Sequence, residues 1–180
     1  MTGTAVGIVP VEGRGSLPFT LLDGESLVAV ASWALEDAGV ELLDFTADWT
    51  DVQARDAMLV LHDPLCPGTP ADFLSLAVDA ATGGAVVVGV RPVTDTVKTV
   101  DDAGFLGDTV DREGLVAVAS PVVLPAAVVA SLSEQPALDD FAGLVAWLRE
   151  RHVVTLIDAP PRARRVADES DVRLVEELTR

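Results

Sequence analysis

The sequence predicts a three-layer α/β fold, in which a mostly parallel sheet carries an inserted β-hairpin arm. Two observations lead to this prediction. Apolar runs typical of buried strands alternate with segments whose apolar residues recur at helical spacing. The alternation is interrupted once, where two strand-like segments flank the turn Asp101–Gly104. We expect one domain over residues 1–180, with the arm inserted at residues 93–115.

The first half of the chain predicts alternating strands and helices. A helix is expected over Leu27–Ala38, because apolar residues recur there at helical spacing. Gly39 is a typical C-terminal stop for it. Another is expected from Thr69 to Thr82, with Thr69 as its cap and Pro70 as its first residue. The remaining expected elements are the strands Ala5–Val11, Val40–Phe45, Met58–Leu61 and Ala85–Val90, and a short helix at Ala47–Asp56.

The second half begins with the hairpin and then returns to the α/β pattern. Turn residues separate its elements, as expected for short connections. The expected elements are the hairpin strands Thr96–Val100 and Phe105–Val110, the strands Leu115–Ala119 and Val153–Asp158, and the helices Pro125–Leu132, Leu138–Arg151 and Ser170–Leu178.

The composition excludes several classes of partner. A net charge of −17 argues against nucleic acid and against anionic membrane surfaces. No apolar run reaches the length of about 18 residues that a membrane span requires. The N-terminus has no signal-peptide pattern, and Cys66 is the only cysteine, so no internal disulfide can form. We expect a cytoplasmic protein.

A glycine-rich loop follows the first strand and reads Glu12-Gly13-Arg14-Gly15-Ser16. A strand that leads through such a loop into a helix is a common phosphate cradle. Here Arg14 is the one basic residue, and Glu12 offsets its charge. Gly13 and Gly15 therefore indicate either anion binding or a tight turn with positive φ. Apolar residues at Leu17 and Phe19 favour a loop that collapses onto the protein.

Several motifs occur together in one order. They are the glycine loop, His62-Asp63 after a strand, the segment Pro92–Leu115, and Ser120-Pro121. In this order and over nearly the whole chain they resemble the methylerythritol phosphate cytidylyltransferases. The resemblance implies a Rossmann-like nucleotidyltransferase fold and transfer of CMP from CTP to methylerythritol phosphate with Mg²⁺. It also implies a homodimer in which each arm completes the partner's substrate site.

The resemblance also implies a role for individual residues. Arg14 and Arg165 correspond to catalytic cations, and Gly13, Gly15 and Ser16 to nucleotide-binding residues. The positions that contact the second substrate are Asp63, Thr96, Arg112 and Ser120, and Asp63 would also bind the metal ion. Simpler interpretations remain open: a capping or solvated acid at Asp63, a turn arginine at Arg112, a strand threonine at Thr96, and a surface ion pair at Arg165.

Departures from the family pattern concentrate on the nucleotide side. Leu17 stands where the loop arginine belongs, and Phe19 where the loop lysine belongs. Cys66 replaces a phosphate-binding arginine, and its thiol is expected to be inert. The stretch between Phe45 and Met58 is too short for the family's cytosine- and ribose-binding segment.

The sequence therefore predicts a degenerate CTP site in a weak or inactive homologue with a binding or regulatory role. The alternative is an active nucleotidyltransferase that moves a nucleoside monophosphate to a polyol or sugar phosphate. Mg²⁺ is the expected cofactor if the protein is active, and none is expected otherwise. Expected partners are a second copy through the arm, or a full-length paralogue in a heterodimer, together with a phosphorylated small molecule.

Overall fold

A six-stranded sheet forms the centre of the computed structural model, which describes residues 4–44 and 47–179. The strands lie in the order β10-β6-β9-β5-β1-β4. β9 runs antiparallel to both of its neighbours, and the other pairs are parallel. The strands are β1 Ala5–Ile8, β4 Glu41–Leu42, β5 Met58–Leu61, β6 Val86–Pro92, β9 Val116–Leu124 and β10 Val154–Asp158.

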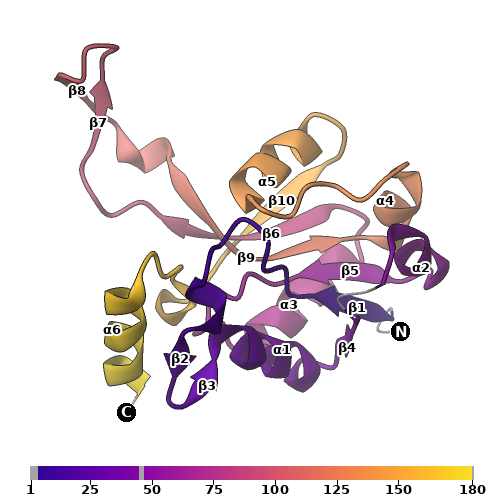
Figure 1. Cartoon of the computed structure of the whole chain (residues 1–180). Helices are drawn as coiled ribbons and strands as arrows, with labels where there is room; N and C mark the ends of the chain where they lie inside the picture. The colour runs from indigo at the N-terminus through magenta and orange to yellow at the C-terminus, as the bar shows by residue number, and fades with distance from the viewer. Residues whose placement is uncertain (1–3, 45–46, 180) are drawn as a thin grey trace.

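Helices cover both faces of this sheet, which confirms the predicted three-layer α/β class (Figure 1). β5 shows the cause, because its alternate side chains enter opposite cores: Leu59 and Leu61 pack with α2, α4 and α5, and Met58 and Val60 with α1 and α3. The helices are α1 Leu27–Asp37, α2 Trp49–Ala54, α3 Ala71–Ala81, α4 Ala126–Ser131, α5 Phe141–Arg149 and α6 Glu169–Thr179.

A third cluster joins α6 to the short hairpin β2 Leu21–Leu22 and β3 Glu25–Ser26, beside α1. Two 3-10 turns, η1 Leu17–Phe19 and η3 Pro161–Ala163, complete this side of the molecule. None of the helices described here has the length and apolar character needed to cross a bilayer.

Helix ends follow local chemistry, with one correction. Gly39 ends α1 at φ +77°, as predicted. The predicted cap of α3 is wrong: Pro70 occupies the N-cap position, and the Thr69 hydroxyl instead donates to the Cys66 carbonyl over 2.8 Å. α5 begins later than predicted, because the Asp140 carboxylate accepts hydrogen bonds from the N–H groups of Ala142 and Gly143.

Strand lengths differ from the prediction at several places. β1 ends at Ile8, short of the predicted Val11, and β6 extends to Pro92, past the predicted Val90. β4 covers only Glu41–Leu42, and the predicted end at Phe45 lies outside the described residues. β9 continues past the predicted end at Ala119 to Leu124, because its apolar end is hydrogen-bonded between β5 and β6. The pairing with β6 is irregular next to Gly89, where a Cβ would lie 2.6 Å from the Ser120 carbonyl oxygen.

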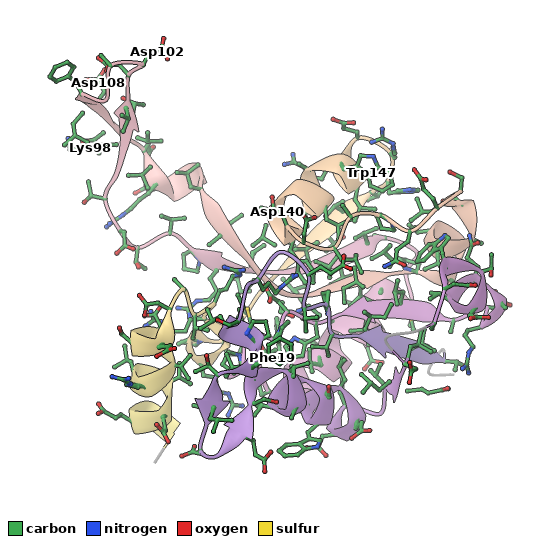
Figure 2. The ribbon with its side chains drawn as sticks, in the orientation of Figure 1. Phe19, Lys98, Asp102, Asp108, Asp140 and Trp147 are labelled. Atoms are coloured by element: carbon green, nitrogen blue, oxygen red, sulfur yellow. The ribbon has the colours of Figure 1, made fainter. Side chains whose placement is uncertain are left out.

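The predicted hairpin is present and projects from the body of the molecule (Figure 1). β7 Val97–Val100 pairs antiparallel with β8 Leu106–Val110, and η2 Arg112–Gly114 follows. Figure 2 shows Lys98, Asp102 and Asp108 on this arm, well away from Phe19 and Trp147 on the body. Val100, Phe105 and Leu106 leave 61–75% of their surfaces exposed, so the arm carries apolar side chains without a core of its own.

Candidate functional site

The glycine loop after β1 makes two left-handed turns. Gly13 has φ +72° and Gly15 has φ +58°, which L-residues with a side chain adopt only with strain. Gly13 also lies against the segment before α5, because a Cβ there would come within 2.6 Å of the Asp139 Cβ. A Cβ at Gly15 would meet nothing within 4 Å. Conformation therefore explains both glycines, and close contact explains Gly13 in addition.

Arg14 points into the protein. Its side chain is 1% exposed, and its Nε donates to Asp63 Oδ1 over 2.9 Å. Its Nη1 donates to the carbonyls of Glu12 and Leu138 over 2.7 and 2.9 Å. The guanidinium also lies 5.2 Å from the centre of the Phe141 ring. The one cation of the loop is thus held by interior groups.

Asp63 follows β5 and binds two arginines. Oδ1 accepts from Arg14 and from the Leu65 N–H, and Oδ2 accepts from Arg165 Nε over 2.9 Å. Burial opposes ionisation of Asp63, but the Arg14 charge, the Leu65 N–H and the hydrogen bonds from Arg165 and Arg14 together hold its pKa below the ordinary value. Arg165 remains 46% exposed on its side chain, so it is the accessible cation of this group.

Ser120 and His62 lie beneath Asp63 and are fully buried. The Ser120 Oγ accepts from the Asp63 N–H over 3.0 Å and lies 2.5 Å from His62 Nδ1. Desolvation lowers the pKa of His62 from 6.5 to about 4, although Asp63 acts in the opposite direction. His62 Nε2 is the one buried side-chain nitrogen or oxygen in the described residues that lacks a hydrogen-bond partner. Ser120 and His62 therefore hold the backbone at Asp63 in place from the protein interior, through the Ser120 hydroxyl.

Thr96 and Arg112 lie on the arm, apart from this group. Both are exposed and line a hollow of about 320 Å³ with Thr109 and Glu113. Arg112 Nη1 donates to the Thr94 carbonyl. Ser16 lies elsewhere again, on the rim of a groove between Phe19 and α6. Arg14, Asp63, Arg165 and Ser120 therefore come together, and Gly13 and Gly15 flank Arg14 in the loop. Ser16, Thr96 and Arg112 lie apart from this group.

Comparison with known proteins identifies the family. The family model described as "IspD: 2-C-methyl-D-erythritol 4-phosphate cytidylyltransferase" matches residues 47–145. The enzyme of that name from Nocardia farcinica is 30% identical, with 98% of this chain and 94% of the relative covered. This chain belongs to the 2-C-methyl-D-erythritol 4-phosphate cytidylyltransferase family. The homologue from Rhodococcus jostii is 32% identical, with 88% and 68% covered.

Solved structures of this family have the same fold. The cytidylyltransferase from Thermus thermophilus superposes with a TM-score of 0.69 at 20% identity, covering 99% of both chains. The 4-diphosphocytidyl-2C-methyl-D-erythritol synthase from Anaerococcus prevotii gives 0.67 at 11% identity, covering 98% of this chain and 97% of the other. The alignment with the Nocardia cytidylyltransferase spans 219 residues, whereas this chain has 180 residues. The Nocardia protein therefore carries segments that have no counterpart in this chain.

The two apolar residues at the loop positions where cations are expected behave differently. Leu17 is half-buried against the cluster that includes Leu22 and Leu27, as the collapsed loop predicts. Phe19 contradicts the same prediction, because it remains 58% exposed. Pro18 is buried between them, and the 3-10 turn directs the next side chain outward. Cys66 is fully buried, and burial raises the pKa of its thiol far above the ordinary value, which makes it a poor nucleophile.

The residues around Asp63 do not fit a resident Mg²⁺ ion. Hard cations favour carboxylate oxygens, and Asp63 is the carboxylate here. Both of its oxygens already accept from guanidinium groups. Within residues 4–44 and 47–179, no group of three or more acidic, histidine or cysteine side chains is placed to hold a metal ion.

Sequence reasoning missed the segment Leu138–Phe141. It supplies a carbonyl and an aromatic ring to Arg14, and it places Asp139 against Gly13. The Asp-Asp pair at 139–140 signals only a helix start, a role that Asp140 fulfils. No pattern in the sequence connects this segment to a loop more than 120 residues earlier.

Proposed function

We propose that this cytidylyltransferase-family protein has a degenerate nucleotide half-site and serves a binding or regulatory role in place of efficient CMP transfer. One observation carries the proposal: the loop cation, Arg14, is committed to Asp63 and to the Leu138 carbonyl inside the protein. A guanidinium held there cannot also meet a triphosphate outside the loop.

The surroundings of the loop add to this deficit. Asp139 lies against Gly13, and Phe19 is exposed where a lysine would supply charge. Nucleotidyl transfer depends mainly on positioning and on preorganised charge. Removing one such stabiliser typically costs about a hundred- to a thousand-fold in rate. Two loop cations are absent and Arg14 is turned inward. We therefore expect CMP transfer from CTP to be several orders of magnitude slower than in a family enzyme that has these cations in place.

The arm supports a role in association. Its exposed apolar side chains would gain by burial against another chain. Thr96 and Arg112 line a hollow at the same projection, where a partner's site could use them for a phosphorylated ligand. We therefore propose a homodimer through the arm, with a heterodimer with a full-length paralogue as the second arrangement.

An active nucleotidyltransferase is the alternative function. The half-exposed Arg165 favours it, because this guanidinium could turn from Asp63 toward a phosphate. Mg²⁺ would then have to reach the site with the nucleotide, since the residues here offer no vacant carboxylate pair.

Calorimetry separates the two functions. CTP with Mg²⁺ is titrated into the protein at low salt, and an established family enzyme serves as positive control. The degenerate site predicts no saturable heat below millimolar CTP, and no pyrophosphate release from a panel of nucleoside triphosphates with sugar and polyol phosphates. Micromolar CTP binding would reject the proposal, and pyrophosphate release from any pair would establish the alternative.

A further inference from the structure

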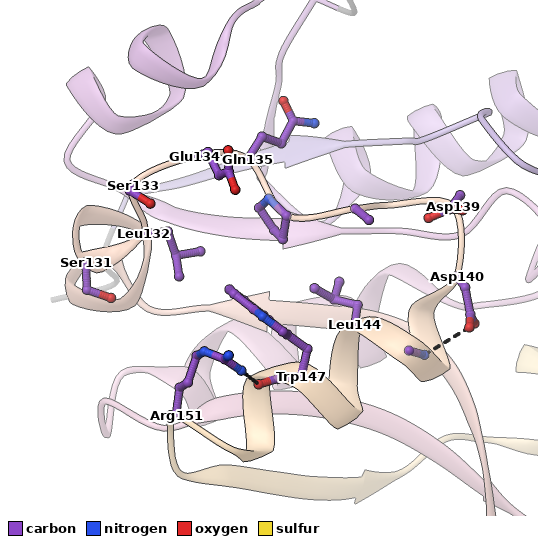
Figure 3. A pocket seen from close by; sticks show the side chains of 13 residues that line it. Ser131, Leu132, Ser133, Glu134, Gln135, Asp139, Asp140, Leu144, Trp147 and Arg151 are labelled. Carbon is purple, nitrogen blue, oxygen red and sulfur yellow. Dashed lines mark hydrogen bonds between the residues drawn. The ribbon is translucent and has the colours of Figure 1, made fainter.

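A cavity of about 640 Å³ lies between α5 and the segment that follows α4 (Figure 3). None of the residues expected to bind nucleotide or second substrate lines it. Apolar side chains form much of its wall, including Leu132, Pro136, Leu144 and Trp147. This volume falls in the range of sites for small organic molecules.

Uncompensated negative charge borders the cavity. Three carboxylates line it, and the Asp140 carboxylate is already satisfied by the start of α5. Glu134 and Asp139 have no hydrogen bond or ion pair with any residue that the structure describes. The one guanidinium in the lining, from Arg151, is paired with Glu150 over 2.9 Å. Phosphorylated or carboxylated ligands are therefore disfavoured here.

Trp147 gives the cavity an aromatic surface. Its side chain extends from α5 toward the middle of the lining, with Leu144 on one side and Arg151 on the other (Figure 3). The Arg151 guanidinium lies 4.6 Å from the centre of the ring, so this ring already attracts a cation. Tryptophan is the side chain that binds cations best through its face.

We propose that this cavity binds a small organic cation with a flat apolar body, such as an aromatic ammonium compound. The body packs against Leu132, Leu144 and the indole, and Glu134 and Asp139 attract the charge. Because Asp139 also lies against Gly13, an occupant of the cavity and the glycine loop share one contact residue. The proposal does not depend on whether the CTP site is degenerate, since none of its contacts involves Arg14 or Asp63.

The test is an NMR titration with benzyltrimethylammonium as the probe. The indole N–H signals of the three tryptophans report its location. We expect the Trp147 signal to shift with saturation, and the Trp33 signal on α1 to stay in place. Glu134→Gln and Asp139→Asn should each weaken binding, by up to about fivefold, as expected for one exposed charge pair. The control Asp102→Asn removes an equal charge at the arm, away from the cavity, and should leave the affinity unchanged.

Phenylacetate, which has the same flat body with the opposite charge, should cause no saturable shift. The proposal is overturned if the Trp147 signal does not move, or if phenylacetate binds as well as the cation. It is equally overturned if Asp102→Asn weakens binding as much as Glu134→Gln does, because the probe would then follow only the overall charge of −17. Trp147→Phe assigns the signal; if that variant does not fold, Trp33→Phe and Trp49→Phe together assign it by elimination.

Discussion

Arg14 and Asp63 form an ion pair 2.9 Å long in which the two side chains are only 1% and 4% exposed. A residue that the sequence places on a phosphate-binding loop is thereby used as a structural link between the loop and the end of β5. Arg165 joins the same carboxylate from the opposite end of the chain. Buried pairs of this kind are costly to break, because the remaining charge loses both water and its partner.

Asp63→Asn should destabilise the fold by about 3–5 kcal/mol, because it leaves the buried Arg14 without its counter-ion. Urea unfolding measures this loss. Glu41→Gln is the matched control, since its pair with Arg55 is also a guanidinium–carboxylate contact, 2.8 Å long, but is about half-exposed on both sides. That change should cost less than about 1 kcal/mol. Equal losses for the two variants would mean that the Arg14–Asp63 pair is not what holds the loop.

The elements could be predicted from the sequence, whereas the ion pair could not. Apolar periodicity decided the helices and strands, because alternate residues of β5 and the stripe of α3 each face a core. The direction of Arg14 depends instead on Leu138 and Phe141, whose distance from the loop no local pattern encodes. The same limit applies to Ser120 and Asp63. The resemblance predicts that both contact a substrate, but it does not predict the hydrogen bond from the Asp63 N–H to the Ser120 hydroxyl.

Acid should destabilise the protein in a window set by His62. Its folded pKa is lowered to about 4 from an unfolded value near 6.5, so the unfolded chain takes up the proton first as the pH falls. Stability should therefore fall between about pH 6.5 and 4, by an amount on the order of 3 kcal/mol at about 1.4 kcal/mol per pKa unit. The depressed pKa of Asp63 contributes only below its unfolded value of about 3.9.

Unfolding free energies at successive pH values measure this dependence. His62→Asn should lower the stability at neutral pH but remove most of the slope in the window. His152→Gln alters the other histidine of the chain and should keep the slope. A slope that survives His62→Asn would assign the acid sensitivity to other groups.

Gly13→Ala should cost more stability than Gly15→Ala. Both positions require positive φ, for which an alanine costs roughly 1 kcal/mol. At Gly13 the added methyl group also meets Asp139, whereas at Gly15 it enters open space. Thermal unfolding of the two variants should show an extra loss of at least about 1 kcal/mol at Gly13, within the range for strained sites. Identical losses would show that the segment before α5 yields freely.

The arm should mediate self-association. Phe105→Ser combined with Leu106→Ser removes two side chains that are 71% and 75% exposed in the isolated chain. If they are buried between subunits, the double variant should sediment as a monomer where the unmodified protein sediments as a dimer. Val153→Ser alters an equally exposed residue beside β10 and should leave the dimer intact. A monomeric unmodified protein, tested without any paralogue present, would exclude the homodimer.

Restoring charge to the loop should recover part of its affinity for polyphosphate. Leu17→Arg with Phe19→Lys places two cations where the family pattern has them, and Phe19 is already exposed to solvent. Two exposed ion pairs of up to about 1 kcal/mol each predict a gain of up to about thirtyfold in the affinity for CTP or tripolyphosphate, and this gain should fall as salt is added. Calorimetry at low ionic strength measures it, with Phe19→Leu as the uncharged control.

The gain should remain far from full CTP binding, because Arg14 stays bound to Asp63 and Asp139 stays beside Gly13. If the double variant bound CTP at micromolar concentration, the loop cations alone would account for the deficit, and the inward direction of Arg14 would have no part in it.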